Sequence, residues 1–319
     1  MDLTSLFMDA FRRREHLFDD DKNNAFRLCN GSGDGVEDIT IDLYDRFVLV
    51  QFFNVNLYRE KATICSAISE AIDKSRMGID GILLKNRARV KDPERISKIR
   101  ESELLAGKMP PRQYQVIQNG VKVYVDLLKG QSTGLFLDMR RVRERLSEIY
   151  SDGGSMVNFF SYTGQFSVHA LKNGIDTALN VDLSRSVLKR AMNNYRLNDL
   201  AVDDRDFVYG DAIEWIKVFK KKDRRFSFIV FDPPTFARNR KRTFSVQQDF
   251  ERTVPHLAHL CNSDTSFVLT SINSASVSEN EYRSFHPASW ELVFLENESD
   301  DFPWKSDPYL KVGLWHPKI

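Results

Sequence analysis

The sequence has little cysteine, no long apolar run and almost no net charge, and each shortage narrows the class of protein. Its three cysteines, Cys29, Cys65 and Cys261, are far apart and form no CxxC pair. A disulfide framework or a zinc site is therefore not expected, and a reducing cytoplasm fits. No apolar run approaches the roughly 18 residues that cross a bilayer, and the N-terminal segment places its charges after its apolar residues, unlike a secretory signal. We expect a cytoplasmic protein that has neither a membrane nor a metal as a partner.

The net charge of +1 argues neither for nor against nucleic acid, but the basic residues are clustered. Phosphate-binding surfaces are built from such clusters, although a solvated helix face or loop explains any single cluster more simply. The clusters are Arg12–Arg14, Lys85–Arg100, Arg140–Arg145, Lys217–Arg225 and Arg238–Arg242.

Residues 1–128 mix strand patterns with a helical pattern. Runs rich in β-branched and aromatic residues predict strands, and apolar residues at helical spacing predict a helix. In chain order these are strands 39–43 and 47–53, helix 58–72, and strands 81–84, 114–117 and 121–126. The Asn119-Gly120 pair between the last two strands is typical of a tight hairpin turn. We predict a small α+β domain, residues 1–128, that ends in this hairpin.

Further along the chain, strands and helices alternate, which predicts a parallel sheet with helices on both faces. The expected strands are 156–160, 177–181, 206–209, 226–231 and 266–270, and the expected helices are 139–150, 164–172, 186–198, 212–219 and 246–260. The last two strands, 290–295 and 310–315, have no clear helix between them and predict a final antiparallel pair. A dinucleotide-binding fold would be expected to close with another βαβ unit, so this ending favours a methyltransferase.

Three aspartates, Asp182, Asp211 and Asp232, stand at the ends of three expected strands. Open α/β sheets bind ligands outside the carboxyl ends of their strands. Asp182 is suited to accept hydrogen bonds from ribose hydroxyls, and Asp211 from an adenine amino group. Asp182 could instead be a helix N-cap, and capping of the helix at 212–219 is an equally good role for Asp211. The three together favour a nucleoside site.

The loop after the first of these strands, NFFSYTGQF, contains one glycine, Gly164. The GxGxxG pattern is not satisfied, so a pyrophosphate cradle is not supported. A nucleoside with an amino-acid tail needs less room for phosphates, and a helix N-terminus supplies N–H groups to it. We expect cofactor contacts from this loop and from the neighbourhood of the acids: Asn158, Phe160, Ser161, Tyr162, Thr163, Gly164, Asp182, Ser184, Asn198, Asp211, Ala212 and Asp232.

The turn Asp232-Pro233-Pro234-Thr235-Phe236 follows the fourth expected strand. Paired prolines fix φ and hold the turn rigid, so backbone carbonyls and Thr235 or Phe236 can lie beside a target base. Methyl transfer needs the nucleophilic nitrogen held in line with the sulfonium methyl and an aromatic ring stacked on the base. We assign the catalytic role to these five residues. A plain strand-ending turn is the alternative.

Together, NFFSYTGQF, the acid at 182, GDA, DPPTF and TGLFLDMR resemble the bacterial 23S ribosomal RNA large-subunit methyltransferases I and K/L. The resemblance runs from about Phe26 to the C-terminal PYLKVGLW. It implies a class I, Rossmann-like methyltransferase domain with a seven-stranded mixed sheet, residues 129–319, behind a small α+β domain that serves the RNA substrate. It also implies S-adenosylmethionine as cofactor, 23S ribosomal RNA as partner, and cofactor contacts from Phe136, Asp138 and Arg140 in a closing loop.

Two departures separate this sequence from type I of that family. Type I begins with an RNA-binding PUA domain, which we do not expect because the sequence starts too late. Type I also methylates carbon 5 of cytosine with a cysteine in a Ser-Cys-Ser segment, where this sequence has Asn273. Carbon 5 is not nucleophilic until a thiolate adds to carbon 6. The residues 243–249, TF-x-VQ-x-D, are instead similar to type K, which methylates guanine N7, and we expect direct transfer to a base nitrogen.

The sequence leaves other functions open. A cytosine-C5 methyltransferase and a non-catalytic RNA-binding or assembly factor are the main alternatives, and a nicotinamide-dependent oxidoreductase would need a fuller glycine loop. His256 and His259 have a spacing compatible with a metal, but no third ligand is obvious, and Leu257 and Leu260 suggest helix packing.

Overall fold

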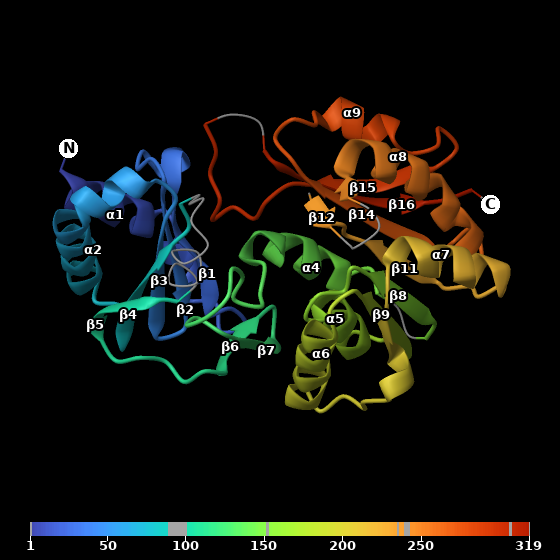
Figure 1. The fold of residues 1–319 in the computed structure, drawn as a ribbon, viewed down its shortest axis with the longest axis horizontal. Helices are drawn as coiled ribbons and strands as arrows, with labels where there is room; N and C mark the ends of the chain where they lie inside the picture. The colour runs from blue at the N-terminus through green and yellow to red at the C-terminus, as the bar shows by residue number, and fades with distance from the viewer. Residues whose placement is uncertain are drawn as a thin grey trace. The chain divides into compact units, whose positions relative to one another are not determined.

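The computed structural model of the chain describes residues 2–88, 101–150, 153–234, 236–238, 243–305 and 308–318, without the side chains of 236–238 and 243–248. The chain divides into two compact units (Figure 1). The first holds Met1–Arg140 and Ser299–Ser306, and the second holds Arg141–Glu298 and Asp307–Ile319. The first unit thus includes residues 129–140 and the segment Ser299–Ser306. The sequence analysis assigned both to the methyltransferase domain.

The first unit is built on a five-stranded sheet in the order β1-β2-β3-β4-β5. Its pairs are antiparallel except β3 with β4, which run parallel because helix α2 connects them. The bounds are α1 Leu3–Arg12, β1 Ala25–Asn30, β2 Ile39–Tyr44, β3 Phe47–Phe52, α2 Lys61–Ser75, β4 Gly81–Asn86 and β5 Glu103–Gly107. Helices α1 and α2 cover one face, where Phe7, Phe11 and Ile68 join a buried apolar cluster. The sequence reasoning missed α1, β1 and β5.

The hairpin β6 Tyr114–Gln118 and β7 Val121–Val125 packs on the other face of this sheet. Its turn residues have left-handed backbones, with φ of +51° at Asn119 and +73° at Gly120, as a tight hairpin turn of this type requires. The hairpin predicted from Asn119-Gly120 is therefore confirmed. Leu127 and Phe302 complete the apolar cluster on this face.

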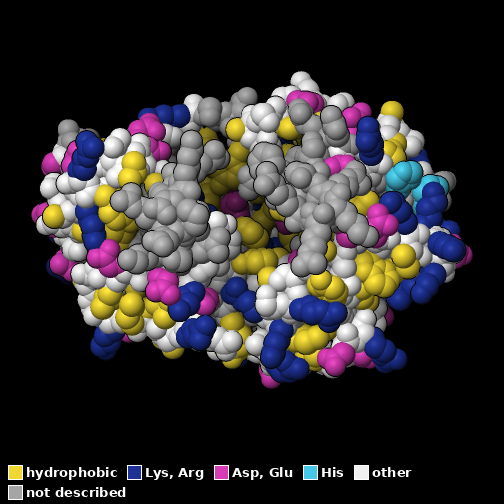
Figure 2. Space-filling view, viewed as in Figure 1, with side chains coloured by type: hydrophobic (Ala, Val, Ile, Leu, Met, Phe, Trp, Pro, Cys, Tyr) yellow, Lys and Arg dark blue, Asp and Glu magenta, His cyan; other side chains and the backbone are white. Residues whose placement is uncertain are grey.

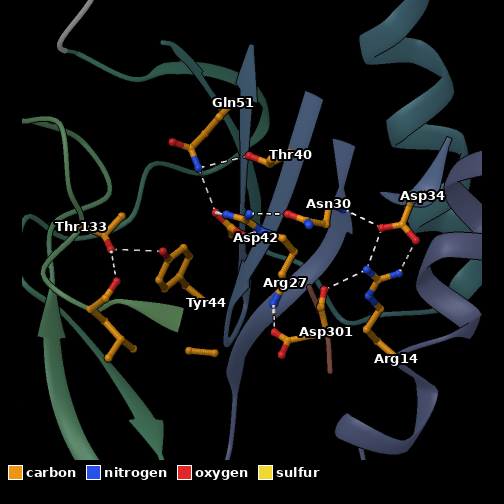
Figure 3. Close-up of polar contacts among 12 residues, drawn as sticks. Arg14, Arg27, Asn30, Asp34, Thr40, Asp42, Tyr44, Gln51, Thr133 and Asp301 are labelled. Atoms are coloured by element: carbon orange, nitrogen blue, oxygen red, sulfur yellow. Dashed lines mark hydrogen bonds and ion pairs between the residues drawn. The ribbon is translucent and has the colours of Figure 1, made fainter. Parts of the chain in front are cut away.

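The segment Ser299–Ser306 is fixed in the first unit by buried charges (Figure 3). The carboxylate of Asp301, fully buried, accepts from the Arg27 N–H at 2.8 Å and from the Arg140 guanidinium at 3.1 Å. The Asp301 carbonyl accepts from Arg14 at 2.8 Å, and Arg14 also pairs with buried Asp34 at 2.6 Å. Each buried ion thus has a partner of opposite charge, without which burial would be strongly unfavourable.

The second unit is built on a seven-stranded sheet in the order β10-β9-β8-β11-β14-β16-β15. The pairs from β10 to β14 are parallel, whereas β16 runs antiparallel to both of its neighbours. The strands are β8 Ser155–Phe159, β9 Thr177–Asp182, β10 Phe207–Tyr209, β11 Phe228–Phe231, β14 Phe267–Asn273, β15 Glu291–Glu296 and β16 Leu310–His316. The alternating pattern and the final antiparallel pair are confirmed.

The helices of the second unit are α4 Arg140–Ser147, α5 Gln165–Lys172, α6 Arg185–Leu197, α7 Ala212–Lys221, α8 Val246–Leu257 and α9 Glu279–Ser284. The helix expected at 246–260 ends at Leu257 and continues as a 3-10 turn, η6 Ala258–Leu260. A short hairpin not expected from the sequence, β12 Phe236–Arg238 with β13 Thr243–Ser245, follows the DPPTF turn. Strands β8 and β11 are buried along Met156–Phe159 and Phe228–Phe231, as central strands of a parallel sheet must be. No helix among the described residues is long and apolar enough to span a membrane.

Candidate cofactor site

The strand order of the second unit reverses between β8 and β11, because β9 and β10 extend the sheet on one side and β14 on the other. Ligands of open α/β sheets bind at such a point, outside the carboxyl ends of the strands. The parallel pairing of β8 with β9 and with β11, and of β9 with β10, brings four strand ends to this edge. The loops that follow them begin at Phe160, Leu183, Gly210 and Asp232.

The loop after β8 holds two non-glycine residues in the left-handed region, Phe160 at φ +58° and Tyr162 at +48°. Each such residue costs about 1–3 kcal/mol and persists only where the surroundings enforce it, commonly at functional sites. The loop is tied to the end of β9, because the Ser161 N–H donates to the Val181 carbonyl at 3.0 Å. Gly164, at φ +75°, starts α5, and a Cβ there would lie 3.1 Å from the Cβ of Ala191. The glycine predicted to approach a ligand is thus also needed for helix packing.

Two side chains of this loop carry buried polar atoms that find no hydrogen-bond partner among the described residues. They are the Ser161 hydroxyl and both polar atoms of the Gln165 amide. Ser161 is 5% exposed and Gln165 is 6% exposed. A buried polar atom without a partner costs about 1–3 kcal/mol. These atoms therefore suit a polar ligand such as the amino-acid tail of S-adenosylmethionine.

Asp182 ends β9 and organises the neighbouring loops. One carboxylate oxygen accepts from the Tyr162 N–H at 3.0 Å and the other from the Ser184 N–H at 2.9 Å. Because a carboxylate has about four acceptor positions, it retains capacity for ribose hydroxyls. Burial raises the pKa of Asp182, and the backbone N–H groups oppose this rise. The cap of α6 is Ser184, whose hydroxyl accepts from the Val187 N–H, so Asp182 is not the helix cap.

Asp211 is the N-cap of α7 and accepts from the N–H groups of Ile213 and Glu214. The capping role considered for it is therefore present, and Ala212 behind it is buried. Two large apolar side chains are exposed at the neighbouring strand ends, Leu183 at 39% and Tyr209 at 47%. The sequence reasoning missed both.

Asn158 lies beneath the loop, not at its surface. Its amide donates to the Ser167 hydroxyl at 3.0 Å, which donates to Asn180 at 2.8 Å, and Asn180 donates to the Tyr195 hydroxyl at 2.8 Å. The side chains of this chain of hydrogen bonds are buried. It joins β8, α5, β9 and α6 and so fixes the loop from below.

Helix α6 also supports the loop, through a residue that the sequence reasoning missed. The Asn194 amide donates to the carbonyl of buried Thr163 at 2.9 Å. Asn198, expected at the cofactor, lies at the C-terminal end of α6 and donates to the Asn194 carbonyl at 2.8 Å. Asn194 lies four residues before Asn198 and so on the same face of the helix. This spacing was the sequence signal that could have identified Asn194.

Asp232 follows β11, and its carboxylate accepts a hydrogen bond from the hydroxyl of Ser271 on β14. Pro233 is buried and Pro234 is exposed. Thr235 lies outside the described residues, as does the side chain of Phe236. The Asp232–Ser271 bond joins two adjacent strand ends, and Asn273 ends β14 close by in sequence.

Neither the position of Cys261 nor the ionisation of the three thiols suits catalysis at this edge. Cys261 forms a β-bridge with Phe226, which precedes β11. Cys261 therefore lies at the amino end of β11, whereas Asp232 lies at its carboxyl end. Burial raises the pKa of the Cys29 and Cys261 thiols to about 12, and burial also raises that of Cys65. Cys29 and Cys65 belong to the first unit. A thiol must ionise to act as a nucleophile, so these thiols are unsuited to that role.

The three residues expected in a closing loop belong to the first unit. Phe136 is 45% exposed. The Asp138 carbonyl accepts from the N–H and the hydroxyl of Ser299, both at 3.0 Å, and the Arg140 guanidinium pairs with Asp300 and Asp301. Asp138 and Arg140 thus help to hold the segment Ser299–Ser306, called the inserted segment below, in the first unit.

Comparison with known proteins agrees with this geometry. Residues 33–300 match a family described as S-adenosylmethionine-dependent methyltransferase. A candidate ribosomal RNA large subunit methyltransferase of Bacillus subtilis, YwbD, is 31% identical over 88% of this chain and 69% of its own. Ribosomal RNA large subunit methyltransferase I of Yersinia pseudotuberculosis is 29% identical over 75% of this chain and 58% of its own. The chain thus matches less than two thirds of the Yersinia protein.

Solved structures give the same answer. A methyltransferase candidate crystallised with SAH, the product left by S-adenosylmethionine, has a TM-score of 0.88 and 26% identity and covers 98% of this chain and 80% of its own. A candidate S-adenosylmethionine-dependent methyltransferase from Streptococcus mutans has a TM-score of 0.86 and 25% identity, with the same coverage.

The class I fold and the S-adenosylmethionine cofactor expected from the sequence are thereby confirmed, and the nicotinamide-dependent alternative is wrong. The chain belongs to the S-adenosylmethionine-dependent methyltransferase family.

Proposed function

We propose that the protein methylates a base nitrogen of large-subunit ribosomal RNA, guanine N7 in particular, by direct transfer without a covalent enzyme–RNA intermediate. The ribosomal substrate is supported by the names of the relatives, which are ribosomal RNA large subunit methyltransferases. Such a substrate agrees with the cytoplasmic location expected from the sequence.

The residues that hold the cofactor in this proposal line the strand ends of the second unit. Ser161 and Gln165 offer their buried polar atoms to the amino-acid tail. Asp182 accepts from the ribose hydroxyls with its remaining acceptor capacity, since a carboxylate makes stronger hydrogen bonds than a neutral acceptor. Leu183 and Tyr209 supply the exposed apolar surface that an adenine ring needs.

The other residues predicted at the cofactor have a supporting position in this proposal. Asn158, Thr163, Ser184, Asn198 and Ala212 are proposed to shape the pocket from behind, since all five are buried or bonded to backbone. The contacts of Phe160, Tyr162, Gly164 and Asp211 with the cofactor, and those of Phe136, Asp138 and Arg140, remain predictions.

We propose a nitrogen acceptor because no thiol is placed to activate cytosine carbon 5 among the described residues at this edge. Cytosine carbon 5 needs a thiolate next to the base. The chain has Asn273 at the end of β14, and its nearest thiol in sequence, Cys261, lies at the opposite edge of the sheet. Guanine N7 carries a lone pair, so it needs neither a thiolate nor removal of a proton.

The acceptor is held, in this proposal, by the turn after β11. S-adenosylmethionine, when bound, supplies a methyl group activated by a sulfonium. The Ser271 hydroxyl holds the Asp232 carboxylate in one orientation, and Pro233 and Pro234 keep the following backbone rigid. Asp232 then orients the base by accepting from its N–H groups, while Thr235 and Phe236 are the residues we expect against its ring.

The test is to map the methylated nucleoside. Ribosomal RNA from cells that lack the protein is incubated with the full chain and methyl-labelled cofactor, then digested and separated by mass spectrometry. We expect labelled 7-methylguanosine. Labelled 5-methylcytidine would overturn the nitrogen assignment, and no label in RNA despite cofactor binding would favour a non-catalytic RNA-binding or assembly factor.

A further inference from the structure

The C-terminal end of α7 and the turn that follows it form a segment with a dense group of charges. Exposed side chains along it are five basic residues and one acid, Lys220, Lys221, Lys222, Asp223, Arg224 and Arg225. Exposed His256 and His259, at the end of α8 and in η6, lie beside them, with ring centroids 6.2 Å apart. Figure 2 shows cyan histidine side chains bordered by dark blue Lys and Arg side chains at the right-hand end of the view, where Figure 1 shows α7. We call the seven basic and histidine side chains the α7 basic surface.

Charged side chains of the α7–β11 segment lie close enough to His259 of η6 to change its pKa. The pKa of His259 is lowered first by burial and then by the positive charges of Lys220, His256 and Arg225. Two acids oppose them: Asp223, which pairs with Arg225 at 2.5 Å, and Asp206 of a 3-10 turn, which interacts electrostatically with Arg224. Against the five Lys and Arg side chains, this leaves the positive charge in excess.

The arginines of this surface are held in defined positions. The Arg224 guanidinium lies 5.7 Å from the ring centroid of Phe219 and 5.5 Å from that of Phe226. Arg225 donates to the His259 carbonyl. Side chains that are already ordered lose less entropy when they bind a partner. This distinguishes the surface from a run of freely moving charges.

Stabilisation of the helix end explains only part of the cluster. Cations near a helix C-terminus interact favourably with the helix dipole, which accounts for lysines in the last turn of α7. It does not account for Arg224 and Arg225 beyond the helix, nor for two histidines brought from another segment. A polyanionic partner accounts for all of them.

The α7 basic surface lies at the edge of the sheet opposite the cofactor loops. The Phe226 N–H donates to the Leu260 carbonyl, and the Ser227 N–H donates to the carbonyl of Ser155, the first residue of β8. Strand β11 then runs from this edge to Phe231. At a rise of about 3.3 Å per residue, the path from Phe226 to Phe231 covers roughly 17 Å.

We infer that the α7 basic surface binds the phosphate backbone of the substrate RNA away from the methylated base. This rests on the proposed function and adds a docking surface to it. An RNA whose target base lies at the Asp232 edge must extend about the length of β11, and around the sheet edge, to reach it. The contact therefore serves folded RNA and contributes nothing to a short oligonucleotide.

The test compares two triple variants of the full chain. In one, Lys220, Lys221 and Lys222 are changed to Gln, which removes charge; in the other they are changed to Arg, which keeps it. Binding of a folded ribosomal RNA fragment is followed by fluorescence anisotropy over a range of salt concentrations. Because each phosphate contact contributes about 0.7–0.9 to the slope of log affinity against log salt, we expect the Gln variant to lose about 2 units of slope and roughly tenfold affinity at low salt. The Arg variant should match the wild type.

Binding of SAH by calorimetry and the thermal midpoint establish that each variant is folded. Unchanged RNA affinity and salt slope in the Gln variant would overturn the inference, as would an equal loss in the Arg variant. Either result leaves the proposed function intact if the wild type still methylates ribosomal RNA. A wild type that neither binds nor methylates ribosomal RNA would instead refute the proposed function itself.

Discussion

Asp182 is the residue with which the cofactor assignment can be tested directly. Its carboxylate accepts from two backbone N–H groups and faces the loop after β8. Asp182→Asn keeps the size and one acceptor oxygen but loses the charge, so hydrogen bonds worth about 1.5–3 kcal/mol weaken. We expect the dissociation constant for SAH to rise about tenfold or more by calorimetry.

The matched control for this change is Asp203→Asn, because Asp203 is an acid of the same unit that pairs with exposed Arg205. It should bind SAH like the wild type. An Asp182→Asn variant that stays folded and binds SAH with unchanged affinity would exclude the ribose contact.

The cysteines give a second test at this scale. Since burial raises the pKa of the Cys29 and Cys261 thiols to about 12, both are protonated at neutral pH. We expect Cys29→Ser, Cys65→Ser and Cys261→Ser each to retain methyl transfer, measured as label incorporated into ribosomal RNA. Loss of turnover in one variant, with an unchanged thermal midpoint, would revive the cytosine mechanism.

At the scale of elements, the inserted segment 299–306 depends on Asp301. This buried carboxylate accepts from the Arg27 backbone N–H and pairs with the Arg140 guanidinium. Asp301→Asn breaks the buried pair with Arg140, and breaking such a pair costs about 3–5 kcal/mol. We expect urea unfolding followed by fluorescence to show a loss of that order.

Asp300→Asn is the control for the inserted segment. Asp300 is about half exposed and also pairs with Arg140, so its loss should cost less, because exposed pairs contribute only about 0–1 kcal/mol. Equal losses in the two variants would contradict the role given to Asp301.

His286, which follows helix α9, bonds strand β14 and makes the second unit sensitive to acid. Its ring nitrogen bonds the Thr270 hydroxyl at 2.8 Å, and burial lowers its pKa from 6.5 to about 4. Between pH 6.5 and about pH 4, His286 is protonated in the unfolded chain but not in the folded chain. Stability therefore falls from pH 6.5 down to about pH 4, by roughly 3 kcal/mol in total.

Urea unfolding at pH 7 and pH 5 measures this effect. His286→Gln should reduce the difference between the two pH values by about 2 kcal/mol. Buried His169, whose pKa burial lowers to about 3, maintains part of the dependence in this variant. An undiminished difference in His286→Gln would assign the acid sensitivity to other groups.

At the scale of the whole molecule, the first unit is not a continuous stretch of chain. Residues 1–140 alone lack Phe302 from an apolar cluster and Asp301 from the charges around Arg14 and Arg27. We expect this fragment to be less stable than the same fragment joined to residues 299–306 by a flexible linker. Circular dichroism during urea unfolding checks this, and equal midpoints would show that the segment adds nothing.

A feature of the fold could be predicted where it depends on residues that are close together in the sequence. The hairpin at Asn119-Gly120 and the alternating strands and helices follow from turn chemistry and apolar spacing, and were predicted. Helix α1 and strands β1 and β5 were missed, although Phe7 and Phe11 follow the helical spacing that packs against the sheet. The boundary after residue 128 missed the contacts that bring 129–140 and 299–306 into the first unit.

The candidate site divides in the same way. Asp182, Asp211 and Asp232 were predicted because each lies at or just after the end of a strand, and parallel strands bring their carboxyl ends to one edge. The buried atoms of Ser161 and Gln165 and the exposed rings and chains of Tyr209 and Leu183 depend on packing from neighbouring elements. No local pattern marks such atoms.

By itself, the sequence determined the alternating strands and helices, the final antiparallel pair and the acids at the strand ends, because periodicity, turn residues and strand-end chemistry are local properties. Only the tertiary structure decided that Ser271 holds Asp232, that Cys261 lies at the opposite edge from Asp232, and that Asp301 belongs to the first unit. These are contacts between residues distant in the chain, and they are selected by burial and by the pairing of buried charges, which no short stretch of sequence specifies.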